Sequence, residues 1–232
     1  MKRYFITAAL IACLTVGLVG CGEDTRFKNR RHHDDCTDSH RDDHRQDQKA
    51  YKPIIYLYPE TETDVSVHLD YAGTLTCTYP DYHDGWQVHA KPDGTLTDPE
   101  TGRTYYGLFW EGIEPGSYDM SSGFVVPGNE TVAFLEDALA KLGLTETEAQ
   151  EFIIFWLPQM QDNPYNLIRF QDTAYTKRAK LDIEPKPDTV IRVFMTWRAL
   201  DAPIDIPAQT LSAPQRRGFT VVEWGGSECP VK

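Results

Sequence analysis

Two glutamates stand beside tryptophans in similar tripeptides, Trp-Glu-Gly at residues 110–112 and Glu-Trp-Gly at residues 223–225. An apolar indole next to a carboxyl group can raise its pKa toward the range of a general acid. If Glu111 and Glu223 faced one cleft, they could hydrolyse a glycosidic bond, one as acid and the other as nucleophile or base. The alternative is a structural role, in which each carboxylate is solvated or pairs with a base. The bases considered are Arg169, Arg192 and Arg198.

Aromatic side chains are dense in the stretch 51–110, which holds eleven of them. Tyr56 and Tyr58 alternate with Ile55 and Leu57, so both faces of this segment are apolar or one face is a contact surface. Exposed tyrosine and tryptophan suit binding to glycan or protein, because they bury area with few rotatable bonds to freeze. Packing in the core is the alternative. The binding candidates are Tyr56, Tyr58, Trp86 and Trp110.

Four of the seven histidines lie within residues 32–44, among aspartates and Cys36. Imidazole, carboxylate and thiol groups bind Zn²⁺ or Cu²⁺, so this segment could capture a metal loosely. The spacing matches no structural zinc motif, and a solvated segment of mixed charge is the alternative. The candidate ligands are His32, His33, His40 and His44.

Asp81, His83 and Asp84 could form a small metal or acid-base site, but they precede Gly85 and are typical of a polar turn. Residues 51–232 contain no GxSxG, no HExxH, no P-loop and no Gly-rich dinucleotide turn. No cofactor is therefore expected. The sequence leaves open whether the protein is an enzyme.

The N-terminal residues combine Lys2 and Arg3, an apolar run over 4–19, and the segment Leu-Val-Gly-Cys at 18–21. This pattern predicts a lipoprotein signal peptide over residues 1–20 and lipid attached to Cys21. An ordinary secretory signal with an incidental cysteine is the alternative. No second apolar stretch of about 18 residues follows. The lipid is therefore expected to hold the protein at the cell membrane or outer membrane, on the extracytoplasmic side.

Residues 21–50 are predicted to form a disordered tether, because Phe27 is the one strongly apolar side chain among many charges. The globular body is then 51–232, or 232 − 50 = 182 residues, long enough for a sizeable core. The formal charge is −12, and removing Lys2 and Arg3 gives −12 − 2 = −14. An acidic chain without a basic patch argues against nucleic acid as a partner.

Three of the five cysteines remain once Cys13 leaves with the signal peptide and Cys21 carries lipid. An odd number outside the cytoplasm leaves one thiol free or paired between chains. A bridge between Cys77 and Cys229 is one of the pairings that the sequence leaves open, with Cys36 as the third thiol.

The body alternates between strand and helix patterns. In the β-rich part, 51–128, apolar residues recur with the period of two that strands require, which predicts a sandwich-like pair of sheets. A helical hairpin follows. Its first helix is predicted to begin after the N-cap Asn129 and to end at Gly143. Its second helix is predicted to begin with a capping box of Thr145 and Glu148 and to stop before Pro158. Further strands are predicted over 166–171, 189–197 and 219–224. The hairpin and these strands make up the second part of the body, residues 129–232. The fold class is therefore α+β with mostly antiparallel sheets.

Several segments of the body have a specific pattern: KPIIYLYP at 52–59, DGW at 84–86, LFWEG at 108–112, WLP at 156–158, NPYN at 163–166 and GFTVVEWGG at 218–226. On these segments the chain resembles an uncharacterised family of bacterial and fungal proteins, over nearly all of residues 51–226. The resemblance implies a shared fold. It implies no activity and no catalytic residues.

Two function hypotheses follow from the sequence. The leading one is a membrane-anchored envelope lipoprotein that serves as a binding or interaction module for glycan or protein. The other is a lipid-anchored hydrolase of envelope polysaccharide with Glu111 and Glu223 as its carboxylates. Convergence of the two carboxylates in one cleft favours the hydrolase, and their separation by a sheet favours the binding module.

Overall fold

The structure, a computed structural model, describes residues 47–229. The predicted signal peptide, the predicted lipidation site Cys21 and the metal candidates His32, His33, His40 and His44 lie outside the described residues. The same holds for residues 21–46 of the predicted tether. Its last residues, 47–50, belong instead to the first strand, so the folded body begins earlier than the expected boundary at Tyr51.

The larger of two β-sheets has seven strands in the order β3-β7-β1-β12-β11-β9-β8. Neighbouring strands are antiparallel except β11 and β12, which run parallel. The strands are β1 (Asp47–Tyr58), β3 (Thr74–Tyr79), β7 (Leu108–Pro115), β8 (Phe124–Pro127), β9 (Tyr165–Gln171), β11 (Thr189–Leu200) and β12 (Thr220–Glu228).

The smaller sheet has five antiparallel strands in the order β10-β2-β4-β5-β6. They are β2 (Thr63–Tyr71), β4 (Trp86–Ala90), β5 (Leu96–Thr97), β6 (Thr104–Tyr105) and β10 (Ala179–Glu184). β10 comes from the second half of the chain but pairs with β2, whereas β1, β3 and β7 join the larger sheet. The two predicted parts of the body therefore interleave. The predicted α+β class with mostly antiparallel sheets is confirmed.

The helical hairpin consists of α1 (Thr131–Lys141) and α2 (Glu146–Met160), and a short α3 (Thr173–Arg178) follows later. The capping box of Thr145 and Glu148 is present, and Gly143 ends α1 with a φ of 87° that suits glycine. Asn129 is not the N-cap, because it lies in the 3-10 helix η1 (Gly128–Glu130) and Glu130 takes that position.

The second helix continues through Pro158 to Met160, so the prediction that it stops before Pro158 is wrong. A proline inside a helix frees the carbonyl four residues earlier, here that of Ile154. Ile154 and Pro158 are both exposed, so this carbonyl lies on the solvent side of α2, where water can take the missing donor's place.

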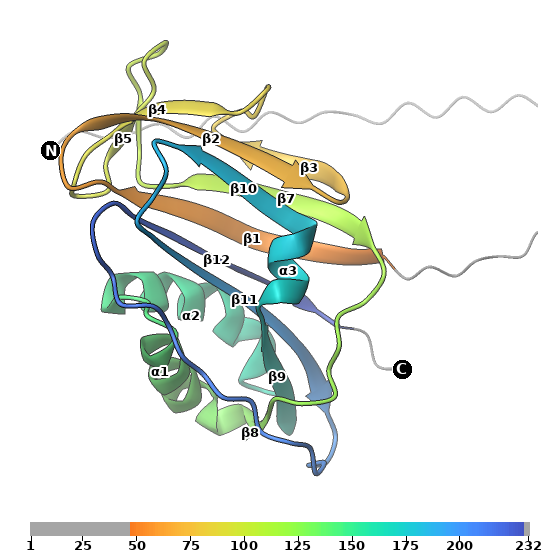
Figure 1. The fold of residues 1–232 in the computed structure, drawn as a ribbon. Coiled ribbons are helices and arrows are strands. Elements are labelled where there is room, and N and C mark those ends of the chain that lie inside the picture. Colours follow the sequence, from red (N-terminus) through yellow and green to blue (C-terminus); the bar gives the residue numbers. More distant parts are fainter. Residues whose placement is uncertain (1–46, 230–232) are drawn as a thin grey trace, which may run out of the picture. The chain divides into compact units, whose positions relative to one another are not determined.

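Three layers result, with the smaller sheet on one face of the larger sheet and the α1–α2 hairpin on the other (Figure 1). The central strand β1 contributes to both interfaces, with Ile55 and Leu57 between the sheets and Ile54 and Tyr56 toward the helices. This is why the predicted alternation placed apolar residues on both faces.

Two helices cannot cover a sheet of this width. Seven strands span about 30 Å between the outer two, whereas two adjacent helices cover about 20 Å. The second helix packs on the centre, with Tyr56 Oη donating to Glu151 Oε2 at 2.5 Å and Phe152 meeting Trp224 at 5.3 Å between ring centres. The helix-side face of β7 and β3 stays open, and Ile113 and Tyr79 are exposed there.

Cys77 and Cys229 do not form the bridge that the sequence left open, and both are free. Cys77 is exposed on β3, whereas Cys229 follows β12, with β7 and β1 between these strands. At roughly 4.8 Å per strand, this separation exceeds the reach of a disulfide. Cys229 is buried, its Sγ donates to Gln48 Oε1 at 3.4 Å, and burial raises the pKa of its thiol to about 11.

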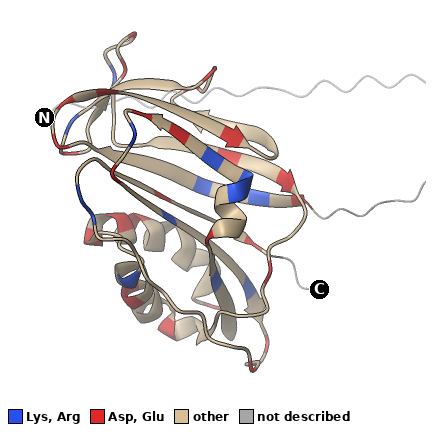
Figure 2. Ribbon diagram, viewed as in Figure 1, with Lys and Arg blue, Asp and Glu red and all other residues tan. Residues whose placement is uncertain are grey.

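Acidic and basic side chains are interspersed over the strands and helices (Figure 2). Within residues 47–229, no helix combines the length and apolar character needed to cross a membrane.

Candidate functional site

A β-bulge in β1 prepares the open part of the larger sheet. The register of β1 shifts between Tyr51 and Ile54 against β12, and across the same stretch against β7. Lys52 has a φ of 58°, the one positive value at a non-glycine residue in the described part of the chain. Such strained backbone and such bulges concentrate beside functional sites.

Glycine opposite the bulge makes room for it. A Cβ built on Gly225 would lie 2.9 Å from the Cα of Pro53, so a larger residue would push the bulge away. The N–H of the displaced Lys52 donates to the side chain of Glu111, at 3.2 Å from Oε1, and not to the backbone of a neighbouring strand. The bulge thereby fixes the Glu111 carboxylate on the open face of β7.

An aromatic pocket of about 500 Å³ surrounds this carboxylate. We define the aromatic pocket by Lys52, Tyr79, Tyr105, Tyr106, Phe109, Glu111 and Phe155, which come from β1, β3, β6, the 106–107 connection, β7 and α2. Tyr79 and Tyr106 are 54% and 58% exposed, so large aromatic surfaces face solvent here. Concave sites of this size with few polar groups are typical of small-ligand binding.

Lysine side chains lie near the Glu111 carboxylate, so the positive and negative charges at the aromatic pocket nearly cancel. Lys49 Nζ lies 3.6 Å from Glu111 Oε2, and Lys52 Nζ lies 5.5 Å from the centre of the Phe109 ring. Desolvation and then the nearby Glu151 raise the pKa of Tyr106, which keeps its hydroxyl protonated as a hydrogen-bond donor. The pocket therefore offers flat apolar rings, a carboxylate acceptor and a phenol donor in one concavity.

Glu223 lies in a different place. It is fully buried between the two sheets, where Arg192 Nε donates to it at 2.6 Å and Trp110 Nε1 at 3.1 Å. Burial opposes the charge on Arg192, but Glu223 outweighs it, and the pKa of this guanidinium is raised. Arg192 is one of the three bases considered as structural partners, so the structural alternative describes Glu223.

The larger sheet separates the two candidate carboxylates. Glu223 shares the inter-sheet face with Leu108 and Ile55, which are its neighbours in the row across β12, β1 and β7. Glu111 is three residues on from Leu108 along β7 and points to the helix-side face. The shared cleft that the hydrolase hypothesis requires is therefore absent for Glu111 and Glu223, which lie on opposite faces of the sheet.

The predicted aromatic binding residues are mostly core. Tyr56, Trp86 and Trp110 are buried, and Tyr58 is half-buried against the helix-side cluster. Tyr56 and Tyr58 pack toward the helices from β1, whereas Trp86 and Trp110 fill the space between the two sheets. Packing in the core therefore overrides the suitability of these rings for contact. The exposed rings are instead those of Tyr79 and Tyr106.

Sequence reasoning did not single out the pocket's rings, although Tyr79, Tyr105, Tyr106 and Phe109 were among the eleven aromatics. One local signal was present. Tyr79 precedes Pro80 at the end of β3, and Tyr106 and Gly107 separate β6 from β7. Neither segment could therefore lie wholly within hydrogen-bonded strands.

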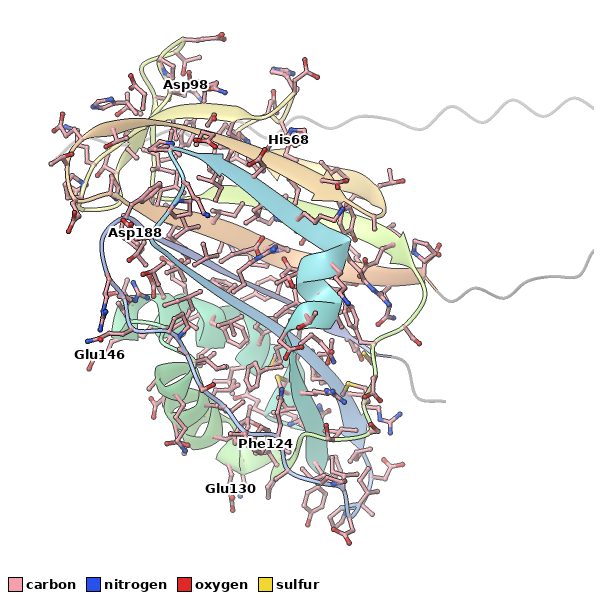
Figure 3. The ribbon with its side chains drawn as sticks, in the orientation of Figure 1. His68, Asp98, Phe124, Glu130, Glu146 and Asp188 are labelled. Carbon is pink, nitrogen blue, oxygen red and sulfur yellow. The ribbon has the colours of Figure 1, made fainter. Side chains whose placement is uncertain are left out.

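A polar pocket of about 510 Å³ adjoins the aromatic pocket and shares Tyr79 and Tyr105 with it. The polar pocket is further lined by Asp81, His83, Trp86, Gln87, Asp98, Glu100 and Arg103. Asp98 lies at the turn between β5 and β6, on the side of the smaller sheet (Figure 3). The residues around His83 form a bend before β4. Within residues 47–229 no group of three His, Cys, Asp or Glu side chains is placed to hold a metal ion.

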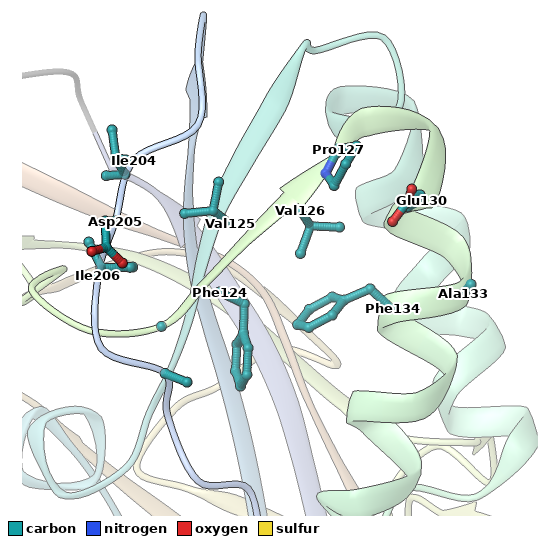
Figure 4. A pocket seen from close by; sticks show the side chains of 12 residues that line it. Phe124, Val125, Val126, Pro127, Glu130, Ala133, Phe134, Ile204, Asp205 and Ile206 are labelled. Carbon is teal, nitrogen blue, oxygen red and sulfur yellow. The ribbon is translucent and has the colours of Figure 1, made fainter.

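A third concavity of about 600 Å³ lies at the opposite edge of the larger sheet, beside β8 (Figure 4). It is mostly apolar, with Phe124 and Phe134 at 5.1 Å between ring centres and Ile204 and Ile206 across from them. Glu130 and Asp205 are its acidic lining residues. It lacks the combination of exposed rings and a held carboxylate that distinguishes the aromatic pocket.

Comparison with known proteins gives one relative. The chain is 36% identical over 115 residues to a protein of Butyrivibrio fibrisolvens described as "Uncharacterized protein in bglA 3'region", and the match covers 48% of this chain and 99% of that protein. The chain therefore belongs to the same family as the Butyrivibrio fibrisolvens protein. No family model matches the chain, and no solved structure matches it. The wider resemblance to bacterial and fungal proteins stays a prediction.

Proposed function

We propose that this protein is a lipid-anchored lipoprotein of the cell envelope and that its body binds glycan in the aromatic pocket. The observation that carries the proposal is the pair of exposed rings, Tyr79 and Tyr106, beside the Glu111 carboxylate. A sugar ring has an apolar C–H face and a rim of hydroxyls. The C–H face packs on aromatic rings, and the hydroxyls donate to a carboxylate and accept from a phenol.

The shape of the site favours glycan over protein as the ligand. A stable protein interface buries about 800 Å² on each partner, usually over a broad surface. The aromatic pocket is a concavity of about 500 Å³ with a few polar groups, which suits one or two sugar rings better than a protein surface.

The carboxylates favour binding over hydrolysis. Glycosidases of the common type use two carboxylates on either side of the scissile bond. Glu111 is the one acidic side chain among the lining residues of the aromatic pocket, and the sheet lies between it and Glu223. The pocket therefore supplies an acceptor for a sugar hydroxyl without the acid-base pair.

The anchor rests on the segment Leu-Val-Gly-Cys at 18–21 and the apolar run before it. Lipid on Cys21 would fix the chain to the membrane, since each buried CH₂ contributes roughly 0.8 kcal/mol. Changing Cys21 to Ser should move the protein from the membrane to the soluble fraction. Unchanged partition of the Cys21→Ser variant into detergent would refute attachment at this residue.

Glycan binding is tested with full-length protein in detergent, by titration calorimetry against a panel of neutral and acidic oligosaccharides. Tyr106→Ala and Glu111→Gln should each weaken binding at least about tenfold, the effect of losing about 1.4 kcal/mol of contact. Val132→Ala and Glu136→Gln are the matched controls, because both residues are exposed on α1, away from the pocket. Their affinities should equal that of the parent.

Two outcomes would overturn the proposal. One is the absence of binding to any glycan of the panel, with the protein folded. The other is glycan binding that Tyr106→Ala and Glu111→Gln leave intact, which would place the site elsewhere. Release of reducing ends by the parent would replace binding by hydrolysis as the function.

A further inference from the structure

Tyr79 and Tyr105 form a common wall between the aromatic pocket and the polar pocket. Their rings meet edge to face, with the centroids 5.4 Å apart and the planes at 88°. More than half of Tyr79 is exposed. A ligand that extends past these two rings from one pocket therefore enters the other.

Two connections that line the polar pocket are held in place before any ligand binds. Trp86 Nε1 donates to the carbonyl of Pro80 at 2.9 Å and anchors the connection between β3 and β4. Asp98 accepts from the Glu100 N–H at 2.8 Å and from Thr101 Oγ1 at 2.7 Å, which closes the turn between β5 and β6. Walls that are already ordered lose little conformational freedom when a ligand binds.

The polar pocket has the chemistry of a sugar hydroxyl site. Gln87 and Arg103 are exposed side chains that donate hydrogen bonds, and Gln87 also accepts them. Asp81, Asp98 and Glu100 outnumber the arginine among the charged lining residues. An anionic sugar would be repelled by this excess of carboxylates, whereas an uncharged one would be accepted.

We propose that the two pockets form one continuous site for an uncharged oligosaccharide. This inference rests on the proposed glycan binding of the aromatic pocket. One sugar unit lies on the rings of the aromatic pocket beside Glu111, the chain crosses the wall of Tyr79 and Tyr105, and the next units bind in the polar pocket against Gln87 and Arg103.

The length of the ligand tests the continuity of the site. Full-length protein in detergent is titrated with series from a single sugar to a pentasaccharide, built from glucose, xylose or N-acetylglucosamine, and with an oligogalacturonide series of matched lengths. In at least one neutral series, the tetrasaccharide should bind at least about tenfold more tightly than the disaccharide. The acidic series should bind more weakly than the neutral one.

A double variant locates the gain from length. Gln87→Ala with Arg103→Ala should reduce the affinity for the tetrasaccharide to that for the disaccharide and leave the disaccharide's affinity unchanged. Gln150→Ala with Lys177→Ala is the matched control, because these exposed residues lie on α2 and α3. The control should keep the full gain.

The outcomes separate this inference from the proposed function. If neutral glycans bind with an affinity that does not depend on length, or if the double variant keeps the gain, the continuous site is refuted while glycan binding in the aromatic pocket stands. Tighter binding of the oligogalacturonides would refute the preference for uncharged ligands. If none of the series binds, both proposals fall.

Discussion

Glu111 and Glu223 have nearly the same neighbours in sequence and opposite surroundings in space. In Trp-Glu-Gly the tryptophan precedes the glutamate, and Trp110 lies between the sheets, so Glu111 points to the open helix-side face. In Glu-Trp-Gly the order is reversed, and Trp224 packs against the helices, so Glu223 points between the sheets. Which face a tryptophan occupies decides where the adjacent carboxylate lies, because side chains alternate along a strand.

This difference separates a structural carboxylate from an available one. Glu223 is buried with a guanidinium and an indole, and both of its oxygens accept hydrogen bonds. Glu111 is held by a backbone N–H from the bulge and lies in a pocket that a ligand can enter. Stability should therefore depend on Glu223, and binding on Glu111.

The largest effect is expected for Glu223→Gln. This change keeps the shape but leaves Arg192 buried without its counter-charge, which should lower the free energy of unfolding by about 3 kcal/mol or more. Urea denaturation measures it. The double variant Glu223→Gln with Arg192→Met should recover part of the loss, because no buried charge is then left alone. A single variant as stable as the parent would show that the inter-sheet pair is dispensable.

An intermediate effect is expected for Glu148→Gln at the start of α2. Glutamine can still complete the capping box, so the change removes mainly the ion pair with Arg216, whose side chain is 29% exposed. The loss should be about 1 to 2 kcal/mol, also measured in urea. If Glu148→Gln lowered the free energy of unfolding as much as Glu223→Gln, the burial of Glu223 between the sheets would add nothing to the cost of removing its charge.

Glu111→Gln should change stability by less than about 1 kcal/mol, since its lysine partner is solvent-exposed and amide oxygen can still accept from Lys52. Glu136→Gln, an exposed acid on α1, is the reference for this measurement. Destabilisation of Glu111→Gln equal to that of Glu223→Gln would make both glutamates structural and remove the contrast between them.

The smallest effect is expected at His89, on the outer surface of the smaller sheet. The protonated His89 ring donates hydrogen bonds to the carboxylates of Asp64 and then Glu62, which raises the pKa of His89 above its usual value of about 6.5. The stabilisation is therefore complete below pH 6.5 and is lost as the pH rises through the higher folded-state value. His89→Gln should lower the melting temperature slightly at pH 5.5, and this difference should shrink as the pH rises through the folded-state pKa of His89. A difference that grows with pH would contradict this sign.

Much of the local structure could be predicted from the sequence. The period of two in residues 65–69 and 86–90 gave β2 and β4, and Gly143 with the Thr145 capping box gave the hairpin. These features depend on neighbours along the chain. Sheet membership does not, and no local pattern announced that β10 pairs with β2 or that β3 and β7 join the larger sheet.

The candidate site was predictable only in its parts. Glu111 and the density of aromatics were visible, but the pocket exists because a bulge displaces Lys52 and because the helices leave β7 uncovered. Both causes are tertiary. For the same reason the sequence could not tell that Trp86 and Trp110 are core residues whereas Tyr79 and Tyr106 are exposed.

The position of β12 bears on how the chain reaches its folded state. β12 is the last described strand along the chain, yet it lies between β1 and β11 in the middle of the larger sheet, and Trp224 Nε1 donates to Tyr56 Oη across 168 residues. Until β12 is available, β1 and β11 each have an unpaired inner edge. Contacts this far apart in sequence slow folding, so the sheet can be completed only after nearly the whole body has been synthesised. A late central strand therefore keeps the nascent chain incompletely folded for most of its synthesis.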